Sequence, residues 1–250
     1  TFSYSVPTGD GTGTITLSVG TDLAGNTITA TPTSGNTFTV DNTAPTAAIT
    51  YDSVGPYKNG ETVVITATFN EDMLDSAISQ ITIAGSGIAT VNATNMTKDS
   101  STVYTFSYSV PTGDGTGTIT LSAGTDEAGF PITATPTSGN TFTVDNTAPA
   151  ISQVTAITTP GNDTTPSYVF SSNQAGTITS NLAFSTTTSA VSGENTITFD
   201  TLAQGTYTGK TITVTDAAGN ASNTLTIPDF TIDTAAPTAA ITYDSVGPYK

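Results

Sequence analysis

Apolar and polar residues alternate with a period of two along much of this chain. Two stretches show the pattern most clearly, Glu61–Phe69 and Val103–Val110. One face of the first carries Val63, Ile65, Ala67 and Phe69, and one face of the second carries Tyr104, Phe106, Tyr108 and Val110. This alternation predicts half-buried β-strands. Since no stretch shows the 3.6-residue apolar period of an amphipathic helix, we predict an all-β chain with essentially no helix.

Strands of this kind, separated by turns rich in Gly, Pro, Asn and Asp, fill two long stretches. Between residues 42 and 145 we predict seven strands: Thr46–Tyr51, Glu61–Phe69, Gln80–Ala84, Ile88–Asn92, Val103–Val110, Thr116–Ala123 and Asn140–Val144. Between residues 146 and 233 we predict six: Ile151–Thr158, Ser167–Ser171, Gly176–Ser180, Asn195–Phe199, Lys210–Thr215 and Asn223–Ile232. Short strands at this spacing favour immunoglobulin-like seven-strand β-sandwiches over a barrel. Tyr207, before the penultimate strand, would then either make a tyrosine-corner hydrogen bond or be an ordinary half-buried tyrosine.

A repeated joint divides the chain. Val40–Pro45 returns unchanged as Val144–Pro149 and more loosely as Ile232–Pro237. The aspartates of successive copies, Asp41, Asp145 and Asp233, lie 104 and 88 residues apart (145 − 41 and 233 − 145), and both intervals suit one sandwich each.

Longer identities mark incomplete repeats at both ends. Residues 1–45 differ from residues 105–149 at four positions, and residues 237–250 repeat residues 45–58 without change. We therefore expect the C-terminal part of a repeat at 1–41, a complete repeat at 42–145, a shorter complete repeat at 146–233 and the N-terminal part of a further repeat at 234–250. The sandwiches would be joined end to end, as a window on a longer array.

The charge balance narrows the classes of partner. With 20 acidic and 4 basic residues the net charge is −16, which argues against binding to nucleic acid and to anionic membrane surfaces. Bound divalent cations or a saline medium would complement such a surface, although it could equally serve only to keep the protein soluble. There is no cysteine, so disulfides are excluded, and no apolar run is long enough for membrane insertion.

One loop and the joint together resemble a known family. Gly205–Tyr207, Thr211–Asn220 and Asp233–Pro237 resemble bacterial immunoglobulin-like repeats of giant surface adhesins. The loop recurs at Thr21–Asn26 and, altered, at Thr125–Phe130. The resemblance implies an extracellular or cell-surface stalk, often stiffened by calcium at its joints. The joint also looks like the calcium-binding linker of cadherins, while a cysteine pair that relatives often carry is absent here.

The sandwich topology gives the calcium hypothesis a physical basis. The loop after the second strand and the loop before the last strand share one pole, next to the incoming joint. Calcium prefers about six to eight hard oxygens. For the first joint the candidates are Asp10, Asp41, Asn42, Glu71, Asp72 and Asp126, and for the second they are Asp145, Asn146, Asn173, Asp216 and Asn220. Phe130, in place of the loop asparagine, weakens the first set. The alternative is that these residues only shape turns.

Residue chemistry makes catalysis an unfavoured function. Without histidine or cysteine the common nucleophilic triads and transition-metal sites cannot be built, and the pair Glu71 and Asp72 lies on a loop that accompanies the joint. Two functions remain: a passive stalk that spaces an adhesive head from the cell, whose partners are neighbouring repeats of the same chain, or a filament in which identical chains associate. Ligand binding by a module is supported only by Tyr51 and Tyr57, which we expect to be exposed.

Overall fold

The computed structural model describes residues 2–242, and the described residues form β-strands with no helix. The prediction of an all-β chain is confirmed. None of these residues belongs to a helix that could cross a membrane. The chain divides into two compact units between Asp145 and Asn146. The portion of the predicted fragment 234–250 that follows Thr242 lies outside the described residues.

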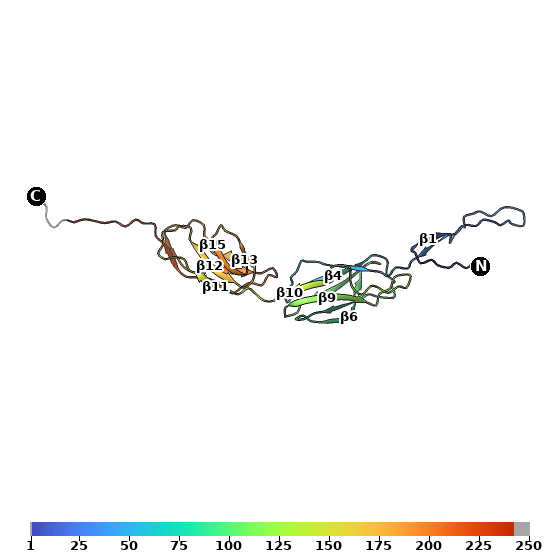
Figure 1. Ribbon diagram of the computed structural model, residues 1–250, viewed down its shortest axis with the longest axis horizontal. Coiled ribbons are helices and arrows are strands. Elements are labelled where there is room, and N and C mark those ends of the chain that lie inside the picture. The colour runs from blue at the N-terminus through green and yellow to red at the C-terminus, as the bar shows by residue number, and fades with distance from the viewer. Residues whose placement is uncertain (1, 243–250) are drawn as a thin grey trace. The chain divides into compact units, whose positions relative to one another are not determined.

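The first unit contains a sandwich of two four-stranded antiparallel sheets (Figure 1). One sheet has the order β3-β4-β8-β7 and the other the order β10-β9-β5-β6. The strands are β3 (Ala47–Tyr51), β4 (Thr62–Phe69), β5 (Gln80–Ala84), β6 (Val91–Asn95), β7 (Thr97–Lys98), β8 (Val103–Ser109), β9 (Gly115–Ser122) and β10 (Thr141–Val144). This is the immunoglobulin arrangement, A-B-E-D facing G-F-C with one additional edge strand beside C.

The prediction of seven strands was wrong in the middle of this sandwich, where the structure has eight. The strand expected at Ile88–Asn92 begins at Val91 instead. Gly87, at φ +78°, forms a turn whose backbone lies against that of Asp114, so a Cβ at Gly87 would come within 1.9 Å of the Asp114 carbonyl oxygen. Met96, 3% exposed, then packs in the core between β6 and β7, which belong to opposite sheets. The chain passes from one sheet to the other between β6 and β7, and this passage produces the additional strand.

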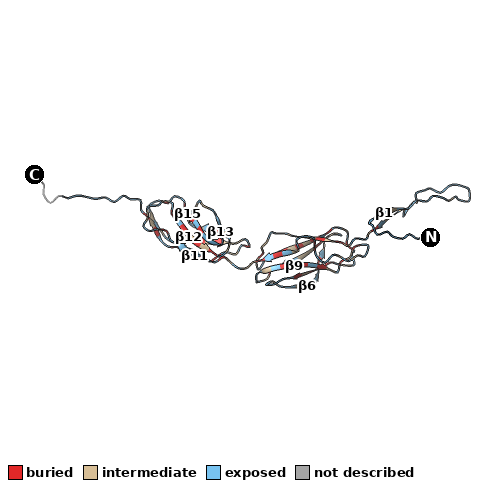
Figure 2. Ribbon diagram, in the orientation of Figure 1, coloured by how far each residue is buried: buried red, intermediate tan, exposed pale blue. Residues whose placement is uncertain are grey.

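The core of the first sandwich has the residues that the alternation predicts. Along β4 the side chains of Val63, Ile65, Ala67 and Phe69 are all buried. The same alternation of buried and exposed positions is visible along β9 (Figure 2). Phe69 meets Tyr104 of β8 edge to face, with ring centroids 5.6 Å apart and planes at 85°. Burial of these aliphatic and aromatic side chains is the main stabilising contribution to the sandwich.

The second unit repeats the plan with shorter strands. Its sheets are β11-β12-β15 and β14-β13-β17-β18, with a separate pair β16-β19. The strands are β11 (Ile151–Thr155), β12 (Ser167–Ser172), β13 (Gly176–Ser180), β14 (Ser189–Ala190), β15 (Gly193–Thr198), β16 (Gly205–Tyr207), β17 (Lys210–Thr215), β18 (Leu225–Ile227) and β19 (Phe230–Ile232). The single strand expected at Asn223–Ile232 is split in two, because Pro228 has no N–H to donate to a ladder.

Tyr207 makes the predicted corner. Its hydroxyl donates to the carbonyl oxygen of Ala203, four residues upstream, at 3.0 Å. Its ring stacks on Phe230 of β19 with the centroids 5.1 Å apart. The tyrosine-corner interpretation is therefore confirmed over that of an ordinary half-buried tyrosine.

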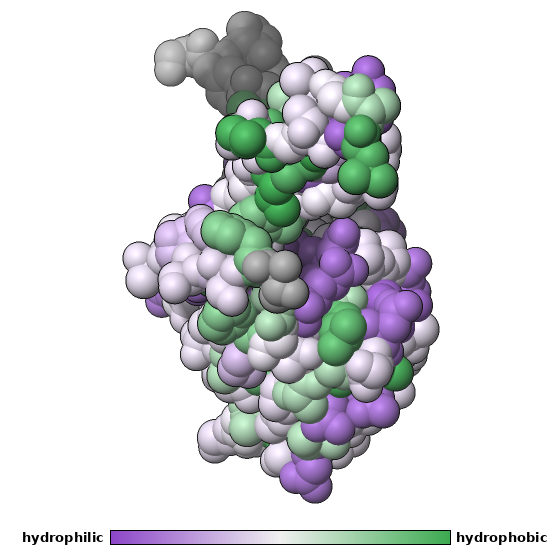
Figure 3. All heavy atoms as spheres, turned by 90° about the vertical axis from the view of Figure 1, so that its right-hand side faces the viewer, coloured by the Kyte–Doolittle hydropathy of each residue, from purple (hydrophilic) through white to green (hydrophobic). Residues whose placement is uncertain are grey.

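Residues 2–41 form a two-stranded ribbon of β1 (Gly11–Thr14) and β2 (Thr37–Val40). Their apolar side chains are far more exposed than identical residues 104 positions later in the sandwich. Tyr4 is 54% exposed and its counterpart Tyr108 only 3%, and Leu17 is 38% exposed against 1% for Leu121. Figure 3 views the chain from the side on which Figure 1 marks the N-terminus, and apolar residues are visible at this surface. The same sequence is buried or exposed according to whether partner strands cover it.

Candidate metal centre

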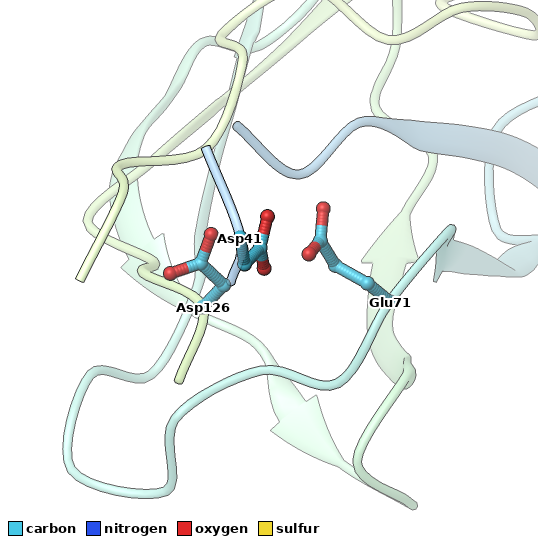
Figure 4. A group of neighbouring side chains, drawn as sticks. All are labelled: Asp41, Glu71 and Asp126. Carbon is cyan, nitrogen blue, oxygen red and sulfur yellow. The ribbon is translucent and has the colours of Figure 1, made fainter. Parts of the chain in front are cut away.

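Three carboxylates from separate segments meet at one end of the first sandwich. Asp41 lies between β2 and β3, Glu71 follows β4, and Asp126 follows β9. Their ligand oxygens all lie within 4.8 Å of one another, and no other group of three or more acidic side chains this close occurs among residues 2–242. Figure 4 shows Asp41 between the other two side chains, with the carboxylates of Asp41 and Glu71 facing each other.

Backbone hydrogen bonds hold the three segments in place. The Thr46 N–H donates to Oδ1 of Asn70 at 2.7 Å, and the Asn70 N–H donates back to the Thr46 carbonyl at 3.0 Å. This pair fixes the start of β3 beside the residue that precedes Glu71. An isolated antiparallel bridge between Met73 and Asp126 joins the other two segments. The convergence of the carboxylates is therefore built into the loops of the sandwich.

Asp126 is the most unusual member of the group. It is only 1% exposed. Its Oδ1 accepts a hydrogen bond from the Phe130 N–H at 2.8 Å, whereas its Oδ2 is buried with no hydrogen-bond partner in the described part of the chain. Buried polar atoms are almost always paired, and a buried charge is costly unless a counter-charge or hydrogen bonds compensate it. A carboxylate oxygen in this position is suited to ligating a cation.

The electrostatics of Glu71 also indicate that this group of carboxylates lacks a compensating positive charge. Burial raises the pKa of the Glu71 carboxyl, and the charge of Asp41, hydrogen bonding to Asp41 and the charge of Asp126 raise this pKa further. Three like charges this close disfavour simultaneous ionisation. The chain has only four lysine and arginine residues, and one of them, Lys98, pairs with Asp75. A bound cation would remove the repulsion.

Asp10 and Asp72, which were also predicted for the first joint, do not belong to this group of three carboxylates. Asp72 is exposed and lies outside it. Asp10 accepts a hydrogen bond from the Thr43 hydroxyl and another from the Asn42 N–H at 2.6 Å, and these bonds lower the pKa of the Asp10 carboxyl. The Asn42 amide donates to the carbonyls of Gly9 and Pro7 at 3.2 and 3.3 Å. Asp10 and Asn42 thus tie the segment before β3 to an upstream turn.

The set predicted for the second joint is divided between the units. Asp145 belongs to the first unit, and Asn146, Asn173, Asp216 and Asn220 belong to the second. Within the second unit, Oδ1 of Asn173 accepts from the Ala150 N–H at 2.7 Å. The Asp216 carboxylate accepts from both the backbone N–H and the side-chain amide of Asn220, at 2.9 and 3.0 Å. Asn173, Asp216 and Asn220 therefore make local loop contacts.

The expectation that Tyr57 is exposed was wrong. Tyr57 is 3% exposed, and its hydroxyl donates to the Ser53 carbonyl at 2.6 Å. Tyr51 is half-buried, and its hydroxyl donates to the Gly139 carbonyl at 2.6 Å. Both rings also pack on Phe142. Packing on Phe142 and these hydrogen bonds give both tyrosines a structural role at the end of the sandwich, and the burial of Tyr57 removes it as an exposed ligand-binding residue.

Comparisons with known proteins show a structural likeness to solved structures. No protein-family model and no curated protein matches the chain. A solved structure described as FdeC, a broadly conserved Escherichia coli adhesin, is similar with a TM-score of 0.38 and 17% sequence identity. The match covers 82% of this chain and 71% of that one.

Proposed function

We propose that this chain is a non-enzymatic stalk segment of an extracellular or cell-surface protein, and that calcium (Ca2+) stiffens it. Its repeats would space an adhesive head from the cell, and the immediate partners of each repeat would be its neighbours in the same chain. The observation that carries the proposal is the convergence of Asp41, Glu71 and Asp126 around a buried oxygen that no donor reaches.

Calcium fits this set of ligands better than the other common cations. It binds hard oxygens at about 2.3–2.6 Å, so opposite ligands lie about 4.6–5.2 Å apart, and oxygens within 4.8 Å of one another can surround one ion. Magnesium binds at about 2.0–2.1 Å and requires a tighter octahedron. The absence of histidine and cysteine disfavours transition metals. Three carboxylates would leave the remaining positions to carbonyl oxygens or water.

Such an ion would brace the segment that enters the sandwich. Asp41 is separated from β3 by only five residues, Asn42–Thr46. One of them, Pro45, is buried and has a fixed φ, and its carbonyl accepts from the Thr133 N–H at 2.9 Å. A cation that binds Asp41 together with two sandwich loops would remove the remaining freedom around Asp41. Ligation thereby turns electrostatic repulsion into a cross-link.

The geometry supports a structural role for these carboxylates over a catalytic one. A general acid or base must reach the proton that it transfers. Asp126 is 1% exposed, so a substrate has no direct access to it. This is consistent with a residue chemistry that already disfavours the common catalytic arrangements.

A self-associating filament is the second candidate, and one observation favours it. The N-terminal ribbon leaves several large apolar side chains more than half exposed, namely Phe2, Tyr4, Val6, Val19 and Leu23. Contiguous exposed apolar surface often marks a site of association. A sedimentation coefficient that rises with protein concentration would favour the filament, and one that stays constant would favour the stalk.

Small-angle scattering of the full chain tests the stiffening. In calcium we expect a narrower distribution of particle dimensions than in chelator, because ligation restrains the segment at Asp41. Asp126→Asn should remove the difference between the two conditions. Asp72→Asn, which removes a charge from the exposed neighbour of Glu71, should retain it. Identical scattering of the unsubstituted chain with calcium and with chelator would show that proline and packing alone set the stiffness.

A further inference from the structure

The loop that contains Asp126 occurs three times in the described chain with one backbone conformation. Its copies are Asp22–Asn26, Asp126–Phe130 and Asp216–Asn220. In each copy the first residue's N–H donates to the carbonyl of the fifth residue, at 3.0, 3.1 and 3.1 Å, and the fifth residue's N–H donates to the aspartate Oδ1, at 2.9, 2.8 and 2.9 Å. The glycine at the fourth position has φ of +86°, +96° and +81°.

The copies differ in what reaches the second oxygen of the aspartate. The Asn26 side-chain amide donates to Oδ2 of Asp22 at 2.8 Å, and that of Asn220 donates to Oδ2 of Asp216 at 3.0 Å. The amide of Asn26 is the leading reason that the pKa of the Asp22 carboxyl is lowered. The side chain of Phe130 has no hydrogen-bond donor, and Oδ2 of Asp126 is buried without a partner among the described residues.

We infer that the fifth residue of this loop determines whether its aspartate is available to a divalent cation. An asparagine occupies the second carboxylate oxygen with its own amide, so that a cation would have to displace an existing hydrogen bond. Phe130 leaves that oxygen open. The inference rests on the proposed calcium site and assigns Phe130 a selecting role, opposite to the weakening that the sequence suggested.

A second position also distinguishes the sandwich that has a candidate calcium site from the one that does not. Asn70 and Asn173 make equivalent reciprocal hydrogen bonds with Thr46 and Ala150, the residues that immediately precede the first strands of their sandwiches. The next residue is Glu71 in the first sandwich but Gln174 in the second. The sandwich with the open aspartate therefore also has the additional carboxylate. The sandwich with the occupied aspartate has a neutral amide there.

Two measurements on the full chain test the role of Phe130: a calcium titration monitored by calorimetry, and thermal melting in chelator. Phe130→Asn should lower the calcium affinity by roughly tenfold to a hundredfold, the range typical for changes in the partners of metal ligands. Phe130→Leu, which also lacks a donor, should change the affinity by less than about threefold, since only an added amide competes with the ion. In chelator, Phe130→Asn should melt at a higher temperature than Phe130→Leu, because Oδ2 of Asp126 gains a donor.

The outcomes separate this inference from the proposed function. If the unsubstituted chain binds no calcium, both are wrong. If it binds calcium and Phe130→Asn binds it equally well, only the selecting role of Phe130 is wrong. A Phe130→Asn chain that melts below Phe130→Leu in chelator would also contradict the inference, since the amide would then not satisfy the buried oxygen.

Discussion

A hundredfold excess of calcium over its Kd is expected to stabilise the first sandwich by about 2.7 kcal/mol, and Asp126→Asn is expected to abolish that stabilisation. The effect would arise because the proposed ion would bind only the folded arrangement of Asp41, Glu71 and Asp126. For a domain of about 100 residues, each kcal/mol corresponds to about 4–8 °C in Tm. Differential scanning calorimetry in calcium and in chelator measures the shift.

The matched control is Asp216→Asn. Asp216 occupies the same loop position in the second sandwich but is already hydrogen-bonded by Asn220. Its substitution should destabilise the second sandwich slightly and leave the calcium response of the first intact. In chelator, Asp126→Asn should be no less stable than the unsubstituted chain, because it removes a charge from a repulsive cluster. A calcium-dependent rise in Tm that persists in Asp126→Asn would show that Asp126 is not a ligand.

Phe199→Ala is expected to destabilise the second sandwich by about 3–5 kcal/mol, the usual cost of truncating a buried aromatic side chain. Phe199 is fully buried, in a cluster of side chains contributed only by the second unit. The first sandwich has its own cluster, so its unfolding transition should stay in place. Calorimetry that resolves the two transitions measures both effects at once.

Val191→Ala provides the comparison for this second prediction. Val191 belongs to the same unit but is 57% exposed, so its truncation should change the free energy of unfolding by at most about 0.5 kcal/mol. If Phe199→Ala lowered the melting temperature of both sandwiches equally, the two cores would not unfold independently.

Much of the fold could be predicted because its determinants are local. The alternation of apolar and polar residues predicted the bounds of β4 and β8 to within one residue. It also identified the buried face of β4, since alternate side chains of a strand point to opposite sides of the sheet. The start of β6 could not be predicted in this way. It depends on the packing of the turn at Gly87 against Asp114, which is distant in sequence.

The candidate site was predictable in part for a similar reason. Sandwich topology indicates that the loops of Glu71 and Asp126 share a pole with Asp41, and the structure brings these three together. The hydrogen bonds that engage Asp10 with Asn42 depend on the detailed path of an upstream turn. The role proposed for Phe130 could not be predicted from the sequence. An asparagine at this loop position looks like a metal ligand in the sequence, whereas in the structure Asn220 donates a hydrogen bond to Asp216.

The most direct test of the calcium site is an isothermal titration of the full chain with calcium, beside the variant Glu71→Gln. Glu71→Gln preserves the size of the side chain and removes one of the three charges. The proposed site predicts saturable binding to the unsubstituted chain and binding weaker by at least about tenfold in the variant, because a ligand charge is lost. No saturable binding to the unsubstituted chain, or equal affinity in both proteins, would contradict a calcium site at Asp41, Glu71 and Asp126.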